Sequence, residues 1–172
     1  MAATEPETLQ DPQAPAPPDA LGAVELLARL SEEVARAERL GNSLSCLAVI
    51  VDDLGELDQG PGESLRQELT AYLARAVSSE LRTFDRVGVS PDGTLMVILP
   101  GADGPTAELV ARRILERIRT IKLESGGARR PIRVSVGLAA WRESVGAEQL
   151  AARAVRVALA PVAAGELVAN RA

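Results

Sequence analysis

Apolar residues recur at helical spacing in four stretches of the chain. This spacing predicts helices over residues 20–40, 64–81, 106–123 and 147–160. The apolar face expected for the first helix consists of Leu27, Leu30, Val34 and Ala37. The residues expected to point inward from the third helix are Leu109, Ile114, Leu115, Ile118 and Ile121. We expect the first helix, capped by Asp19, to pack on its own domain, and the alternative is a signalling or dimerising helix.

Short apolar runs between these helices predict strands. Residues 44–51 are typical of a buried strand that ends at Asp52-Asp53. Residues 94–99 are apolar almost throughout, as in a strand covered on both faces. The preceding Ser90-Pro91-Asp92-Gly93 is a turn signal, because Pro presets φ, Asp bonds its own backbone and Gly tolerates a positive φ. The pattern therefore predicts a β-hairpin in the middle of the chain.

The last third of the chain adds two more strands. Residues 132–139 alternate at first like a strand, and residues 166–169 read as a final edge strand. Residues 125–131 are expected to form a flexible basic loop. The element order predicts an α/β (α+β) two-layer sandwich around a central antiparallel hairpin, ferredoxin-like with an extra helix at each end. Hydrophobic pattern alone leaves the strand order open.

The first 19 residues differ from the rest. They carry five of the eleven prolines, four acidic residues and no basic one. A segment of this composition buries too little apolar surface to offset its ordering entropy, so we expect a disordered acidic tail over residues 1–19. The folded domain is then expected over residues 20–172.

Composition excludes several classes of function. A net charge of −5 and 2% aromatic residues argue against nucleic-acid binding. The chain has no histidine and one cysteine, which removes zinc centres and histidine-based catalysis. Cys46 lies in the first strand and is expected to be a small core residue rather than a nucleophile. No apolar run reaches membrane-spanning length and no signal peptide is seen, so we expect a cytoplasmic protein without membrane contact.

Four segments match the pattern of one known family in order and spacing, namely Leu30 to Ser45, Leu81 to Val87, Met96 to Asp103 and Val134 to Ala139. On these segments the chain resembles the GGDEF (diguanylate cyclase) family, from about Leu26 to Val168. The resemblance implies the family's nucleotidyl-cyclase fold, with the signature hairpin centred on residues 91–95. Its departures from the family pattern make the chain a degenerate GGDEF-like domain.

The hairpin tip carries the largest departure. Family members read Gly-Gly-(Asp/Glu)-Glu-Phe there, where glycines let the backbone approach GTP phosphates and a carboxylate helps to hold metal ions. This chain reads Pro91-Asp92-Gly93-Thr94-Leu95. Proline replaces a glycine, Thr94 and Leu95 replace the Glu-Phe pair, and Asp92 is one position early.

Other family positions are changed as well. Ile50 occupies the place of a metal-ligating Asp, and Asp58 is the best match to the guanine-reading Asn. The phosphate-contacting Lys of the last helix has no counterpart in residues 158–163. We therefore expect no cyclase activity, no metal and no cofactor, because phosphoryl transfer needs positioning and charge neutralisation. The alternative, a metal site rebuilt from Asp52, Asp53 and Asp92, is disfavoured by the missing phosphate cradle.

A second family site is retained. Family members are often inhibited by cyclic di-GMP at an Arg-x-x-Asp motif before the signature, and Arg82-Thr-Phe-Asp85 matches it. A further family arginine aligns with Arg113. The resemblance implies that Arg82 and Arg113 hold guanine edges or phosphates while Asp85 accepts guanine N–H donors. The alternative is a surface ion pair between Arg82 and Asp85. The neighbouring arginines, expected to form a solvated basic face, are Arg86, Arg112 and Arg117.

Two functions follow as expectations. One is a catalytically inactive, bacterial-type signalling domain that binds cyclic di-GMP through Arg82, Asp85 and Arg113. The other is a protein-interaction or scaffold module that binds no nucleotide. A protein partner would contact the tail, the first helix or the domain surface. A homodimer fits either function, and the sequence leaves the oligomeric state open.

Overall fold

The computed structural model describes residues 20–52, 62–125, 128–160 and 167–169. The predicted tail over residues 1–19 lies outside these ranges. The helices are α1 (Ala23–Leu40), α3 (Gly62–Ser78), α4 (Gly104–Arg119) and α5 (Ala147–Ala158). The strands are β1 (Leu44–Val51), β2 (Arg86–Val89), β3 (Leu95–Pro100), β4 (Lys122–Ser125), β5 (Ala128–Pro131), β6 (Val134–Ala140) and β7 (Leu167–Ala169).

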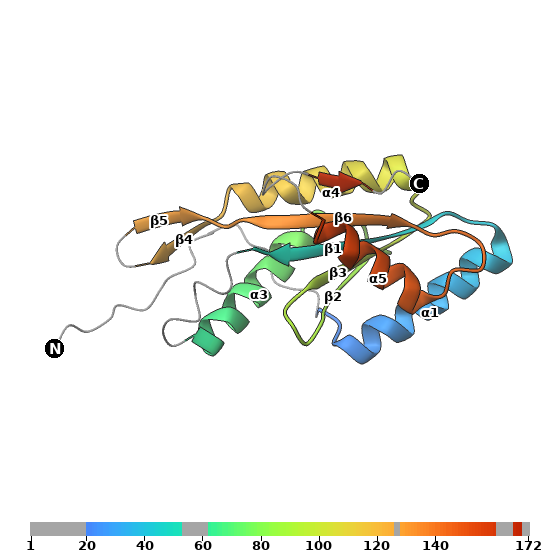
Figure 1. Cartoon of the computed structure of the whole chain (residues 1–172), viewed down its shortest axis with the longest axis horizontal. Coiled ribbons are helices and arrows are strands. Elements are labelled where there is room, and N and C mark those ends of the chain that lie inside the picture. The colour runs from blue at the N-terminus through green and yellow to red at the C-terminus, as the bar shows by residue number, and fades with distance from the viewer. Residues whose placement is uncertain (1–19, 53–61, 126–127, 161–166, 170–172) are drawn as a thin grey trace.

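One five-stranded sheet organises the molecule, in the order β2-β3-β1-β6-β7 (Figure 1). Its first four strands pair antiparallel, and β7 joins the edge parallel to β6. Within it, β1-α3-β2-β3-α4-β6 is the βαββαβ unit of a ferredoxin-like sheet. The predicted fold class, the central hairpin and the final edge strand are confirmed.

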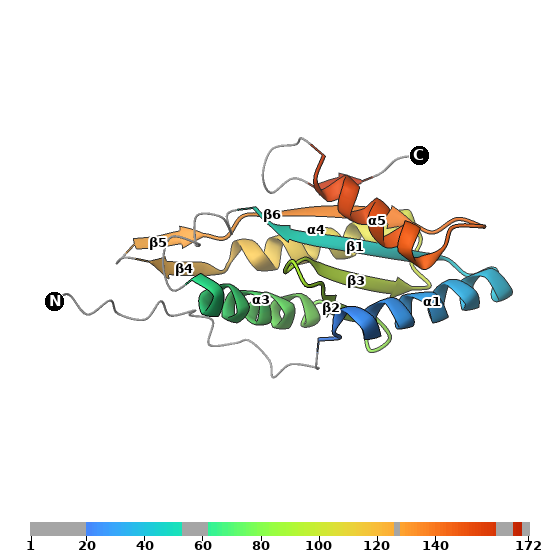
Figure 2. The same cartoon turned by 60° about the horizontal axis from the view of Figure 1, so that its bottom comes forward.

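Two helical layers cover opposite faces of this sheet. Buried residues of α3 and α4 pack on one face, and those of α1 and α5 pack on the other. In Figure 2, α5 lies in front of β1 and β6 while α4 lies behind them. Because both faces are covered, the middle strands are buried almost throughout, as their continuous apolar runs predict.

Helix α5 approaches the sheet closely at one glycine. A Cβ added to Gly137 of β6 would lie 2.1 Å from the Ala154 carbonyl oxygen and 2.3 Å from the Ala158 nitrogen. Only a residue without a side chain lets the helix backbone lie so near the strand. The small residues of α5 and Gly137 thus fix the distance between this helix and the sheet.

Helix α1 belongs to the domain, as predicted, but it begins later than residue 20. Leu21 forms a parallel bridge to Gly88, donating its N–H to the Val87 oxygen (3.0 Å), and its own oxygen accepts the Val89 N–H (2.9 Å). The extended residues 20–22 therefore add to the β2 edge, and Gly22 rather than Asp19 is the N-cap. Its inward face is apolar at Leu26, Leu30 and Ala37, whereas Leu27 is 37% exposed.

The predictions around α4 need two corrections. The helix ends at Arg119 and not at residue 123, and β4 and β5 pair as a hairpin where a flexible basic loop was predicted. The predicted inward residue Leu109 is 64% exposed, since it lies on the side of α4 away from the sheet. The other four, including Ile121 just beyond the helix, are buried.

Candidate functional site

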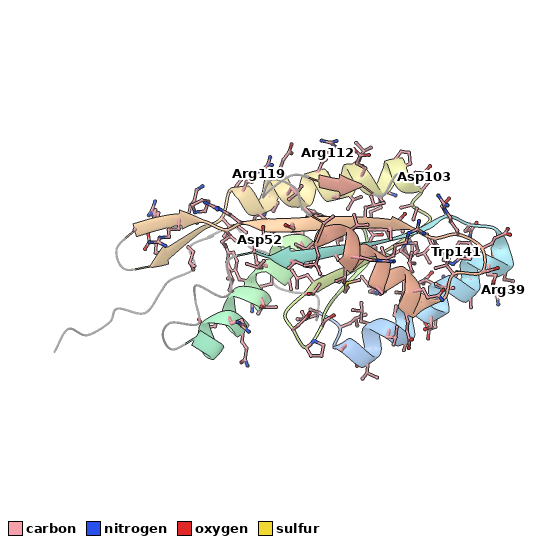
Figure 3. All side chains as sticks on the ribbon, in the orientation of Figure 1. Arg39, Asp52, Asp103, Arg112, Arg119 and Trp141 are labelled. Carbon is pink, nitrogen blue, oxygen red and sulfur yellow. The ribbon has the colours of Figure 1, made fainter. Side chains whose placement is uncertain are left out.

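The two ends of the sheet hold the two groups of candidate residues. We call one end of the sheet the tip end, which is where β1 stops and β3 starts. The opposite end, where β1 and β2 start and β3 stops, is called the turn end. Figure 3 shows Asp52 at the tip end and Trp141 at the opposite, turn end of the sheet. Residues 90–94 belong to the tip end, and Arg82 and Asp85 belong to the turn end, just before β2.

The hairpin tip is a tight turn closed by its own polar atoms. The Gly93 N–H donates to the Ser90 oxygen and the Ser90 N–H to the Thr94 oxygen, both at 2.9 Å. Asp92 accepts the Thr94 N–H on Oδ1 at 3.1 Å, and Gly93 has a φ of +85°. The predicted turn is confirmed. Thr94, which the resemblance aligns with the family's Glu, lies just before β3 and is only 5% exposed.

The polar groups where β1 ends are also engaged. Asp52 Oδ1 accepts the Ser135 hydroxyl at 2.7 Å, and its N–H donates to the Arg133 oxygen at 3.0 Å. Ile50 is half-buried and has no oxygen to offer a cation. Across the described ranges, no three His, Cys, Asp or Glu side chains come together as a possible metal site. Asp53 and Asp58 lie outside those ranges, and the described residues here do not fit the metal centre that the resemblance implies.

At the turn end, Arg82 to Asp85 form a hydrogen-bonded turn. Asp85 accepts the Arg82 backbone N–H on Oδ2 at 2.8 Å, and the Asp85 N–H donates to the Arg82 oxygen at 3.1 Å. The motif is thus joined through the backbone of Arg82. The structure gives the Arg82 guanidinium no hydrogen bond or ion pair with any described residue, so the predicted surface ion pair is not what joins these two residues.

Arg113 reaches the same region from α4. Its Nη2 donates to the Glu80 oxygen at 2.8 Å, two residues before Arg82. A guanidinium has five N–H donors, so most of those of Arg113 remain after this bond. Arg82 and Arg113 are exposed and Asp85 is half-buried. The structure therefore brings the three predicted binding residues to one part of the surface.

The neighbouring arginines have other contacts. Arg86 Nη1 donates to the carbonyl oxygens of Thr83 and Asp85, both at 2.7 Å, and these two hydrogen bonds stabilise the turn. Arg112 Nη2 contacts Glu108 Oε1 at 2.6 Å, and Arg117 Nη1 contacts the Thr120 hydroxyl at 3.2 Å. These local contacts leave Arg82 and Arg113 as the better candidates for an anionic ligand.

Cys46 lies between the two ends and is part of the core. It is fully buried in β1, and burial raises the pKa of its thiol to about 12. A thiol with this pKa is not ionised at neutral pH and is a poor nucleophile. The prediction that it is a small core residue is confirmed.

Known structures share this arrangement. The complex of the *Pseudomonas aeruginosa* diguanylate cyclase SiaD with its activator SiaC contains a similar domain at 27% identity, with a TM-score of 0.75 over 81% of this chain and 54% of that one. The active GGEEF domain of a *Vibrio cholerae* diguanylate cyclase matches at 17% identity, TM-score 0.79, over 90% and 99%. The coiled coil and GGDEF domain of *Caulobacter crescentus* DgcB, solved with c-di-GMP, matches at 14% identity, TM-score 0.78, over 87% and 81%. The chain has the fold of a GGDEF domain.

The GGDEF fold covers most of this chain but only part of some matched proteins. The chain spans about half of the SiaD chain, at 54%. No protein-family model matches the sequence, and no curated protein matches it. Within the described part of the chain, none of the helices combines the length and apolar character that crossing a membrane needs. The likeness therefore rests on the folded arrangement of the elements.

Two residues of the turn end were missed by the sequence reasoning. Glu33 is 3% exposed, although it is charged, and Phe84 is 75% exposed, although it is the single phenylalanine. A helical pattern over Leu26, Leu30 and Ala37 places Glu33 on the same inward face, which was the available signal. The exposure of Phe84 had no such signal, because it depends on the turn geometry.

Proposed function

We propose that this chain is a cyclic di-GMP receptor that lacks cyclase activity. The observation that carries the proposal is the meeting of Arg113 with the turn that holds Arg82 and Asp85. Arg113 lies 2.8 Å from the Glu80 oxygen, and Asp85 closes the turn on the Arg82 N–H. DgcB is a GGDEF-fold neighbour solved with c-di-GMP, which makes this ligand the first to test.

The chemistry of the three side chains suits a guanine nucleotide. The planar fork of Arg82 matches the O6 and N7 acceptors of guanine or a phosphate. Asp85 uses Oδ2 for the turn, so its other oxygen is the one placed to accept guanine N1 and N2 donors. Arg113 adds a second cation beside them.

Three observations at the tip end support the proposed lack of cyclase activity. Ile50 provides no metal ligand, Asp52 and Asp92 accept hydrogen bonds within the protein, and Thr94, just before β3, is 5% exposed. Incubation of the full chain with GTP and Mg²⁺ is expected to yield no cyclic di-GMP. Product formation at a rate that scales with protein concentration would refute this part of the proposal.

Isothermal titration of the full chain with cyclic di-GMP tests the receptor. We expect binding, and a loss of at least tenfold in affinity for Arg82→Ala and for Arg113→Ala, about 1.4 kcal/mol or more each. Asp85→Asn keeps an oxygen that can accept the Arg82 N–H but removes the negative charge. A loss of affinity in this variant therefore reports the contact of Asp85 with the ligand and not the loss of the turn. Arg112→Ala is the matched control, because Arg112 adjoins Arg113 but pairs with Glu108. Unchanged affinity in Arg82→Ala would exclude this site.

The second candidate is a protein-interaction module. The exposed ring of Phe84 favours it, and SiaD is a neighbour solved with a protein, its activator SiaC. If the wild-type chain binds no cyclic di-GMP while remaining folded, this candidate replaces the receptor.

A further inference from the structure

A cavity of about 230 Å³ opens at the turn end, apart from the Arg82 and Arg113 surface. Its walls come from the second half of α1, the start of β1, the end of β3 and the turn before β2. Four residues define its chemistry, namely Arg29, Glu33, Arg36 and Phe84. We call this cavity the α1 groove.

The charged groups of the α1 groove are only partly balanced. Glu33 is 3% exposed, and its Oε1 lies 2.8 Å from Arg29 Nη2 and 3.9 Å from Arg36 Nη1. Arg29 Nη1 also contacts Glu32 Oε2 at 3.2 Å, so two carboxylates share this guanidinium. Arg36 is 53% exposed, and its one ion pair among the described residues is the 3.9 Å contact with Glu33. A carboxylate entering the groove would give the Arg36 guanidinium a closer acceptor.

Phe84 gives the α1 groove an apolar wall. Its ring is 75% exposed, an unusual state for an aromatic side chain in a chain with so few of them. An occupant that suits this groove combines negative charge with an apolar side chain. The chain itself contains such a segment.

Residues 5–11 read Glu-Pro-Glu-Thr-Leu-Gln-Asp, so carboxylates flank Leu9 on both sides. No basic residue occurs before Arg29. The segment is therefore complementary to the groove in both charge and apolar character.

The described chain begins at the same end of the sheet as the groove. Leu21 runs parallel to β2 and pairs with Gly88, so the chain enters the domain from the Arg86 side. Phe84 precedes Val87, the partner of the Leu21 N–H, by three residues, at most roughly 11 Å of chain. The eight residues between Asp11 and Ala20 include four prolines and span roughly 25 Å when extended. That length is sufficient to reach the groove.

We propose that the α1 groove binds residues 5–11 of the same chain, with Leu9 against Phe84 and the flanking carboxylates on Arg36. The proposal does not rest on cyclic di-GMP binding. It assigns the acidic segment a role as an internal ligand of the turn end. Since Phe84 belongs to the turn of Arg82 and Asp85, the occupied groove also holds that turn.

The single phenylalanine provides a specific test. Full-length protein labelled with fluorophenylalanine gives one ¹⁹F resonance, from position 84. We expect this resonance to differ between the wild type and a variant carrying Glu5→Gln, Glu7→Gln and Asp11→Asn. At about 1 M salt, where the Debye length is roughly 3 Å, the wild-type resonance should move towards that of the variant.

Matched variants separate the groove from indirect effects. Neutralising the three acidic residues in an Arg36→Gln background should leave the resonance nearly unmoved, because their partner is already absent. Glu148→Gln removes an exposed carboxylate of α5 and should not move it. Coincident resonances of the wild type and the triple variant at low salt would overturn the proposal. A difference that grows with protein concentration would also overturn it, since the segment would then come from a second copy.

Discussion

The tip end and the turn end belong to the same strands yet hold their polar groups in opposite ways. At the tip end, Asp52 and Asp92 accept hydrogen bonds from nearby protein groups, and Thr94 is packed. At the turn end, Arg82 and Arg113 are exposed, and Glu33 and Arg29 face a cavity. Polar groups that satisfy one another stabilise a fold, whereas groups that keep free donors beside a cavity are suited to binding.

This difference between the two ends bears on which residues to test for function. A GGDEF fold alone does not determine which of its sites remains in use, because function depends on particular side chains. Here the described carboxylates of the tip end accept hydrogen bonds within the protein, and the opposite end carries exposed arginines. Substitutions at the two ends should therefore affect different properties, namely folding stability at the tip end and ligand binding at the turn end.

The largest expected effect comes from Gly137 of β6, where the α5 backbone lies against the sheet. Gly137→Ala places a Cβ 2.1 Å from the Ala154 oxygen, so α5 must move away from β6. We expect the free energy of unfolding to fall by about 3 kcal/mol or more. Urea denaturation followed by circular dichroism measures it. A loss within about 0.5 kcal/mol would show that the helix shifts without cost and would contradict this description of the packing.

A smaller effect is expected from restoring the family carboxylate at the tip end. Thr94→Glu buries a charged group at a position that is 5% exposed, which should lower the free energy of unfolding by about 1–3 kcal/mol. Pro91→Glu is the control, since the same side chain is exposed there and only the restriction of proline is lost, at roughly 0.4–1 kcal/mol. Equal losses in the two variants would mean that the tip end is not packed as described.

The comparison also shows what the sequence predicts well. Elements with a complete local signal were predicted, such as the turn at Ser90 to Gly93 and the strand at residues 44–51. The β4–β5 hairpin was not, because buried Ile121 continues the helical spacing of Ile114 and Ile118 past the end of α4. Local periodicity cannot show that the backbone has changed conformation between them.

Sites assembled from distant segments had weaker signals. The Arg82 to Asp85 motif was identified from family resemblance, and the contact of Arg113 with Glu80, 33 residues away, needed the folded chain. The α1 groove combines residues from Arg29 to Gly101 and has no linear pattern. The bridge of Leu21 to Gly88 likewise depends on the β2 edge being available.

The smallest expected effect concerns Asp103, which caps α4, the helix that carries Arg113. Its Oδ1 accepts the Thr106 N–H at 2.9 Å, and bonds from the Thr106 side chain and backbone hold the pKa of this carboxyl below its ordinary value of 3.8. A lowered pKa in the folded state means that the stabilisation is complete above pH 3.8 and is lost as the pH falls through the folded pKa. Asp103→Asn keeps an oxygen acceptor for the cap but has no charge to favour the helix N-terminus. The variant should therefore be slightly less stable than the wild type at pH 7, and this difference should shrink in thermal unfolding as the pH is lowered below 3.8. A difference that does not change with pH would assign the effect to cap geometry instead of charge. Affinity for cyclic di-GMP should be unchanged, because Arg113 lies more than two turns further along the helix.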